Sequence, residues 1–158
     1  MFGKSLSEYV RFQRWFLVLI VVVFAIRLIA SLAGLPIEQT RWLSVNALLL
    51  AGLVYFPLAV HRRGFGGYKQ LFGLLLVQNF LAQFLIALAV VLGIVTGVDN
   101  IFTAPEYSGG ADGKTWLHAG AHLVGWIPAA LIGWLIGSLI LLVARKLQPR
   151  ARVEAASR

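Results

Sequence analysis

The chain has 158 residues, of which 59% are hydrophobic and only 13% charged, and its mean hydropathy is +0.84. Soluble domains carry about 25% charged residues, so this composition excludes an ordinary soluble domain and predicts an integral membrane protein. The absence of cysteine excludes disulfides, thiolate metal sites and thiol nucleophiles. The net charge of +8 would suggest nucleic-acid binding in a soluble protein, but a membrane protein uses such charge at its surfaces, and we expect no nucleic-acid partner.

Four apolar stretches divide the chain, and each is long enough to cross the hydrocarbon core as a helix, which takes about 20 residues. Turn-forming and polar segments separate them, and the links are mostly short, which favours an antiparallel bundle. The sequence therefore predicts an all-α membrane protein with a single four-helix domain over residues 1–147. The predicted spans are about 15–35, 42–60, 70–96 and 118–144, with a loop over 97–117 and a basic tail over 148–158.

The first fourteen residues are polar and basic, with Ser5 and Glu8 at the spacing of a capping box. We expect a short helix here that lies in the membrane interface before the first span.

The distribution of lysine and arginine predicts the orientation. Arg41 and Lys114 lie on one side of the predicted membrane, together with Glu38, Asp99, Glu106 and Asp112. The other side carries the remaining basic residues outside the spans: Lys4, Arg11, Arg14, Arg62, Arg63, Lys69, Arg145, Lys146, Arg150, Arg152 and Arg158. By the positive-inside rule both termini are expected in the cytoplasm, in a bacterial-type inner (plasma) membrane.

The fourth span carries a stripe of small residues at every fourth position. Small side chains let helix backbones approach closely, so this stripe is predicted to pack against other helices of the bundle or against a second copy. Its members are Ala121, Gly125, Ala129, Gly133 and Gly137.

Arg27 is the only charged residue deep in a predicted span. A cation at such depth costs roughly 2.5 to 3.5 kcal/mol even on the lenient insertion scale, so it requires a partner, water or an anion. Polar residues of the other three spans lie at depths that could converge on Arg27 in the outer half of the bundle. The predicted ligand-binding set is Arg27, Asn46, Asn79, Gln83 and His122, beneath the long acidic loop.

His118 and His122 are four residues apart, which places both imidazoles on one helix face, where they could hold a metal or haem. A haem between helices usually takes a second histidine from another span, and His61 belongs to the opposite end of the bundle. The sequence requires no cofactor.

The leading hypothesis is a non-catalytic subunit or small oligomer that binds a lipid headgroup, a quinone or a small anion in the pocket around Arg27. Its partners would be membrane lipids and either partner transmembrane helices or further copies. No predicted span contains Asp or Glu, which disfavours proton-coupled export. Two alternatives remain: an oligomeric channel or transporter for a small solute, and a redox subunit that holds haem or metal at His118 and His122.

Overall fold

The structure, a computed structural model, describes residues 1–40, 42–108 and 112–147 and is helical without strands over those residues. Four helices are long and apolar enough to span a membrane, which confirms the predicted helical fold and is compatible with an integral membrane protein. The predicted tail over 148–158 lies outside the described residues. The helices are α1 (Leu6–Leu32), α2 (Ile37–Thr40), α3 (Val45–Arg62), α4 (Tyr68–Thr96) and α5 (Trp116–Leu147).

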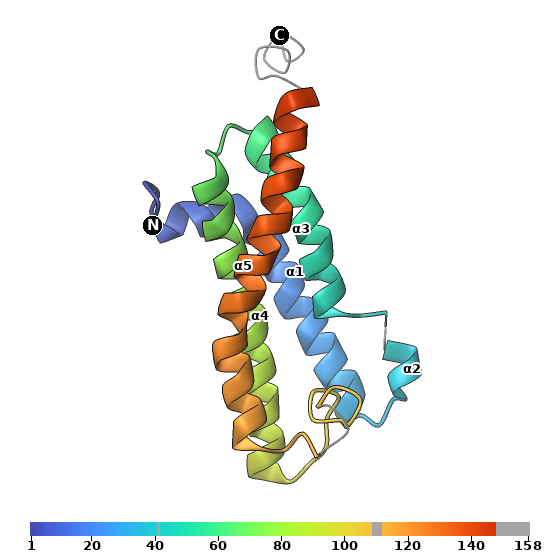
Figure 1. The fold of residues 1–158 in the computed structure, drawn as a ribbon. Helices are drawn as coiled ribbons and strands as arrows, with labels where there is room; N and C mark the ends of the chain where they lie inside the picture. The colour runs from blue at the N-terminus through green and yellow to red at the C-terminus, as the bar shows by residue number, and fades with distance from the viewer. Residues whose placement is uncertain (41, 109–111, 148–158) are drawn as a thin grey trace.

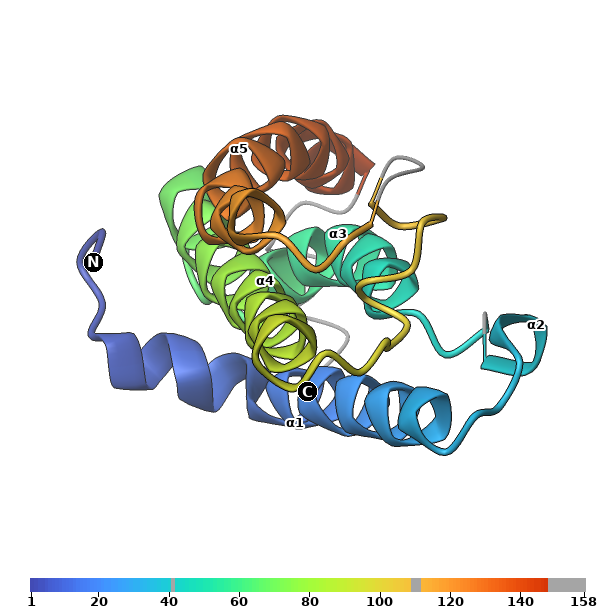
Figure 2. The same cartoon turned by 90° about the horizontal axis from the view of Figure 1, so that it is seen from below.

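Helix α4 is the centre of the bundle. It packs against α1, α3 and α5, and it buries the largest share of its span. Viewed along the bundle, α1 lies on one side of α4 and α5 on the other, with α3 beside them (Figure 2). We call the end that holds residues 33–44 and 97–115 the loop end (Figure 1). The opposite end, with the turn over 63–67 and the last turn of α5, is the basic end.

Helix α1 is longer at its start than the span predicted from hydropathy, because the N-terminal segment continues into it. The capping box forms: the Ser5 hydroxyl accepts from the backbone N–H of Glu8, and the Glu8 carboxylate accepts from the Ser5 N–H at 2.7 Å. The helix then bends at Gln13, whose backbone leaves helical geometry (φ −117°, ψ 16°). The segment before the bend crosses the bundle at an angle to the rest of α1 (Figure 1).

The bend at Gln13 places a buried carboxamide pair between α1 and α4. Gln13 Nε2 donates to the carbonyl of Leu74 at 3.4 Å, and Gln78 Nε2 donates to Gln13 Oε1 at 2.8 Å. Both side chains are buried, and Gln78 Oε1 has no hydrogen-bond partner. The pair therefore links the two helices in a region that offers few other polar contacts.

Replacing Gln13 with leucine should lower the free energy of unfolding by about 1 to 2 kcal/mol, because the Gln78 amide then loses its acceptor inside an apolar interface. Replacing both glutamines with leucine should cost less than the Gln13 change alone, since no buried polar group is left unpaired. Unfolding in mixed micelles titrated with dodecyl sulfate would measure both. A double variant that loses as much as the two single variants together would disprove the coupling.

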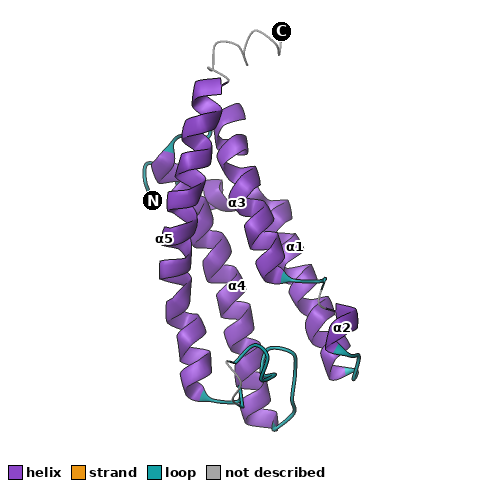
Figure 3. Ribbon diagram, turned by 45° about the vertical axis from the view of Figure 1, so that its right-hand side comes forward, coloured by secondary structure: helices purple, strands orange, loops and turns teal. Residues whose placement is uncertain are grey.

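The described parts of the loop, residues 97–108 and 112–115, fold back onto the helices. Gly97 ends α4 in the left-handed conformation (φ 72°), and the buried Asn100 donates to the carbonyl of Ala89 at 2.9 Å. Phe102 then stacks on Phe24 of α1, with ring centroids 5.2 Å apart. The loop thus covers the loop end of the bundle, on the same side as α2 (Figure 3).

Charged side chains join the two ends of this loop. Lys114 pairs with Asp99 and, at 3.4 Å, with Asp112. The Asp99 carboxylate raises the pKa of Lys114, and a hydrogen bond from the Lys114 backbone N–H lowers the pKa of Asp112. Both carboxylates are exposed, so we expect the contribution of these pairs to depend on salt.

Candidate functional site

Arg27 lies near the loop end of α1, and its side chain is almost completely enclosed, with 5% of its surface exposed. Helix α1 ends at Leu32, so Arg27 is five positions, about 7.5 Å, from the helix end. Nη2 donates to the hydroxyl of Tyr107 at 2.7 Å. The guanidinium also lies over the rings of Tyr107 and Phe102, 5.1 and 6.0 Å from their centroids. The folded loop therefore encloses the cation.

These neutral contacts leave the charge of Arg27 uncompensated. Among the side chains that the structure describes, which do not include those of residues 37 and 38, no Asp or Glu carboxylate lies within 4 Å of the guanidinium, and its Nε is buried without a hydrogen-bond partner. A buried cation without a counter-charge is costly, and an unpaired buried donor adds to that cost. The site is thus arranged to accept a negatively charged or strongly polar group.

A cavity of about 90 Å³ adjoins the Arg27 side chain. Since a water molecule occupies about 30 Å³ in the liquid, this space fits a few waters or one oxyanion such as a phosphate group. All four long helices and the loop contribute to its wall, which consists of Arg27, Val45, Asn46, Ile86, Phe102, Tyr107 and His122. The cavity thus combines a cation, a carboxamide, a phenol and an imidazole.

The predicted site residues do not all meet in this cavity. Asn46 and His122 line it with Arg27, whereas Asn79 and Gln83 line a second hollow of about 370 Å³ between α3, α4 and α5. Asn46 lines both hollows. Gln83 is nevertheless connected to the cavity, because its Oε1 lies 2.5 Å from Nδ1 of His122. The structure therefore divides the predicted pocket into two neighbouring hollows.

His118 and His122 face each other, with their Nε2 atoms 3.1 Å apart. Nδ1 of His118 lies 2.9 Å from the carbonyl of Gly113 and must donate to it. If Nδ1 of His122 donates to Gln83 Oε1, and one proton lies between the two Nε2 atoms, the two rings share three protons and the pair is positively charged. If the Gln83 amide is reversed, its nitrogen donates to Nδ1 of His122, and every hydrogen bond forms with two neutral rings.

This chain of contacts links the loop to α5 and α4. His61 lies near the opposite end of α3, as expected. The described residues hold no group of three or more His, Asp or Glu side chains placed around one metal position. Metal or haem at His118 and His122 stays a prediction.

The His118 contact should restrain the loop. Replacing His118 with alanine removes the hydrogen bond to Gly113, so we expect faster amide hydrogen exchange in loop residues 98–108. Leu117→Ala is the matched control, because the neighbouring Leu117 is 85% exposed. Equal exchange rates in the two variants would show that the imidazole does not hold the loop.

The small-residue stripe of α5 also divides in two. Gly137 is buried, and a Cβ placed there would lie 3.3 Å from Leu71 and 3.4 Å from Pro57, whereas one on Gly133 would lie 3.8 Å from Leu53. These two glycines face α3 and α4. Toward the loop end the stripe turns outward: Ala121 and Ala129 are exposed, and a Cβ on Gly125 would meet nothing within 4 Å.

Sequence reasoning missed Phe102 and Tyr107, the two aromatic residues that enclose Arg27. Both lie in the acidic, glycine-rich loop, where hydropathy gives no sign of burial. Phe102 is buried and Tyr107 is 44% exposed. Two aromatic residues in an otherwise polar segment were the available signal, since loops often carry the residues of a site.

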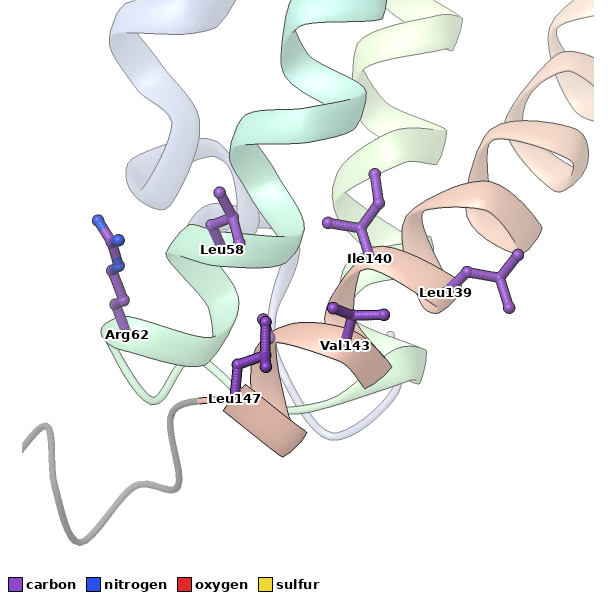
Figure 4. A pocket seen from close by; sticks show the side chains of 7 residues that line it. Leu58, Arg62, Leu139, Ile140, Val143 and Leu147 are labelled. Atoms are coloured by element: carbon purple, nitrogen blue, oxygen red, sulfur yellow. The ribbon is translucent and has the colours of Figure 1, made fainter.

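A further apolar hollow lies at the basic end between α3 and α5, with Arg62 at its edge (Figure 4). Its volume is about 380 Å³, and apart from Arg62 its wall is aliphatic: Leu58, Leu139, Ile140, Val143, Ala144 and Leu147. No enclosed polar group faces it, so the Arg27 cavity is the better candidate for specific binding.

Comparisons with known proteins do not identify the chain: no protein-family model, no curated protein and no solved structure matches it.

Proposed function

We propose that this protein is a non-catalytic integral membrane protein that binds an anionic group in the Arg27 cavity. The observation that carries the proposal is a guanidinium that is 5% exposed, has an unpartnered Nε and lines a cavity with Asn46 and His122. An anion bound there would supply the missing counter-charge and accept a charge-assisted hydrogen bond from Nε. Either the phosphate of a lipid headgroup or a free oxyanion has this chemistry.

The orientation forms part of the proposal. At the basic end the described chain carries Lys4, Arg11, Arg14, Arg62, Arg63, Lys69, Arg145 and Lys146, whereas the described part of the 97–115 loop carries Lys114 with three carboxylates. The positive-inside rule then places both termini in the cytoplasm of a bacterial-type inner membrane and the Arg27 cavity toward the outside. The segment before Gln13 would lie in the cytoplasmic interface, as its angle to the rest of α1 allows.

Association with partner helices or further copies remains part of the proposal. The outward-facing small residues Ala121, Gly125 and Ala129 leave room for the close approach of another helix. An oligomeric channel lined by Arg27, Asn79 and Gln83 has less support, because Arg27 and the two amides line separate hollows.

Thermal unfolding of the detergent-purified protein in sodium phosphate, at an ionic strength held constant with sodium chloride, tests the proposal. Phosphate that binds only the folded state at 100 times its dissociation constant stabilises it by about 2.7 kcal/mol, which raises the midpoint by several degrees. We expect this rise in the native protein and none in Arg27→Gln.

Arg11→Gln is the matched control, because Arg11 is an exposed arginine of the same helix. It should show the native response. If phosphate stabilises Arg27→Gln as much as Arg11→Gln, or stabilises none of the three proteins, the cavity does not bind this anion.

A further inference from the structure

The hollow beside the Arg27 cavity is a groove along the middle of the bundle. Its α3 wall runs from Asn46 to Leu53 and its α5 wall from Ala129 to Ile136, and both helices start at the loop end. On α4, which ends at the loop end, the order is reversed from Gln83 to Leu75. Gln83 and Ala129 both lie 13 residues, about 20 Å, from the loop-end termini of α4 and α5, and Asn46 lies at the start of the shorter α3.

Polarity changes along this groove. Asn46 and Gln83, nearest the loop end, are carboxamides, and Asn79 follows one turn deeper. Beyond them the wall is aliphatic, with Leu53, Leu75 and Ile136, and Gly133 leaves space on the α5 side. Since Asn46 lines both hollows, the sequence of environments is cation, amides and hydrocarbon.

The free hydrogen-bonding groups follow the same order. Asn79 Nδ2 donates to the carbonyl of Leu75 at 2.9 Å, and Gln83 uses its Oε1 toward His122. Among the contacts of the described residues the Asn46 side chain has none, so its amide nitrogen can donate to a ligand carbonyl. A carbonyl is therefore the complementary group between the anion and the apolar part.

We infer that the ligand is an anionic glycerophospholipid of the leaflet at the loop end. Its phosphate would bind Arg27, an ester carbonyl would accept from Asn46, and one acyl chain would lie in the aliphatic part of the groove. This inference rests on the proposed anion site and adds the apolar half of the ligand. The polar part lies nearer the loop end and the apolar part deeper, which matches the order of the groups along a lipid.

Native mass spectrometry of delipidated protein incubated with palmitoyl-oleoyl-phosphatidylglycerol tests the inference. We expect one retained lipid per chain, and less retention of the matching phosphatidylcholine, which has no net charge. Gly133→Leu should reduce the retained phosphatidylglycerol at least tenfold, because the leucine side chain would occupy the groove. The same variant should keep the phosphate-induced rise of the unfolding midpoint, because Gly133 does not line the Arg27 cavity.

Gly120→Leu is the matched control, since a Cβ at Gly120 meets nothing within 4 Å and Gly120 lines neither hollow. It should retain phosphatidylglycerol like the native protein. Should Gly133→Leu fail to fold, Ala129→Leu fills the exposed edge of the same groove.

The outcomes separate the two proposals. Undiminished lipid retention in the groove variants would overturn the lipid inference and leave a free oxyanion as the ligand, provided that phosphate still stabilises the protein. Retention that depends on the groove but persists in Arg27→Gln would show that a lipid binds without its phosphate at Arg27; this would overturn the lipid inference, and the phosphate response alone would then decide on the anion site.

Discussion

Replacement of Arg27 by methionine should make the ligand-free protein more stable, by about 1 to 2 kcal/mol, while abolishing its response to phosphate. Methionine matches the unbranched stem of arginine and removes a buried charge that forms no ion pair with the side chains that the structure describes. The lost hydrogen bond to Tyr107 and the ring contacts offset part of this gain. A binding site kept at the expense of stability behaves in this way.

A structural arginine predicts the opposite sign. If Arg27 serves mainly to hold the loop through Tyr107, both Arg27→Met and Tyr107→Phe should destabilise the protein by similar amounts. Dodecyl sulfate titration without phosphate measures the two variants side by side. Destabilisation of Arg27→Met by more than about 1 kcal/mol would contradict a ligand-binding role for the cation.

Replacement of Gly73 by valine should lower the free energy of unfolding by about 1 to 3 kcal/mol through overpacking. A Cβ at Gly73 would lie 2.6 Å from Cε1 and 2.7 Å from Cζ of Tyr9. Tyr9 cannot move aside easily, because it is fully buried, packs edge-on against Phe65 and donates its hydroxyl hydrogen to the carbonyl of Met1 at 3.1 Å. The glycine therefore lets α4 pack against the N-terminal segment of α1.

Gly120→Val controls for the helix propensity of valine, since Gly120 is also helical and has open space around it. We expect little change in its unfolding. Equal unfolding curves for Gly73→Val and Gly120→Val would show that Tyr9 does not pack against α4 as described. The Gly73 variant should also expose the segment before Gln13 to proteolysis.

The helical fold was predictable because hydropathy alone identifies stretches long enough to span a membrane. Helix boundaries were harder to predict where a polar sequence remains helical: α1 begins at Leu6 through its capping box and bends at Gln13 without a proline. Its other end lies at Leu32, three residues before the predicted end of the span. That difference brings Arg27 closer to the loop end than its place in the hydrophobic run indicated.

The predicted site could be reached only in part from sequence. Arg27, Asn46 and His122, which were grouped by depth along their helices, line one cavity in the structure, and their role in binding stays a prediction. Depth does not tell which way a side chain points around the helix axis. It therefore could not predict that Asn79 and Gln83 line the groove and not the Arg27 cavity. The position of Tyr107 beside Arg27 depends on the fold of its loop. A hydrogen bond from Asn100 to the carbonyl of Ala89 ties that loop to α4.

The Arg27 site would be tested most directly by an experimental structure of the protein in a bilayer that contains phosphatidylglycerol. We predict a phosphate oxygen about 3 Å from Nε of Arg27, with an acyl chain extending from Asn46 past Gly133. A guanidinium paired with a carboxylate of the protein itself, or a cavity that holds water alone while lipid surrounds the helices, would contradict the account.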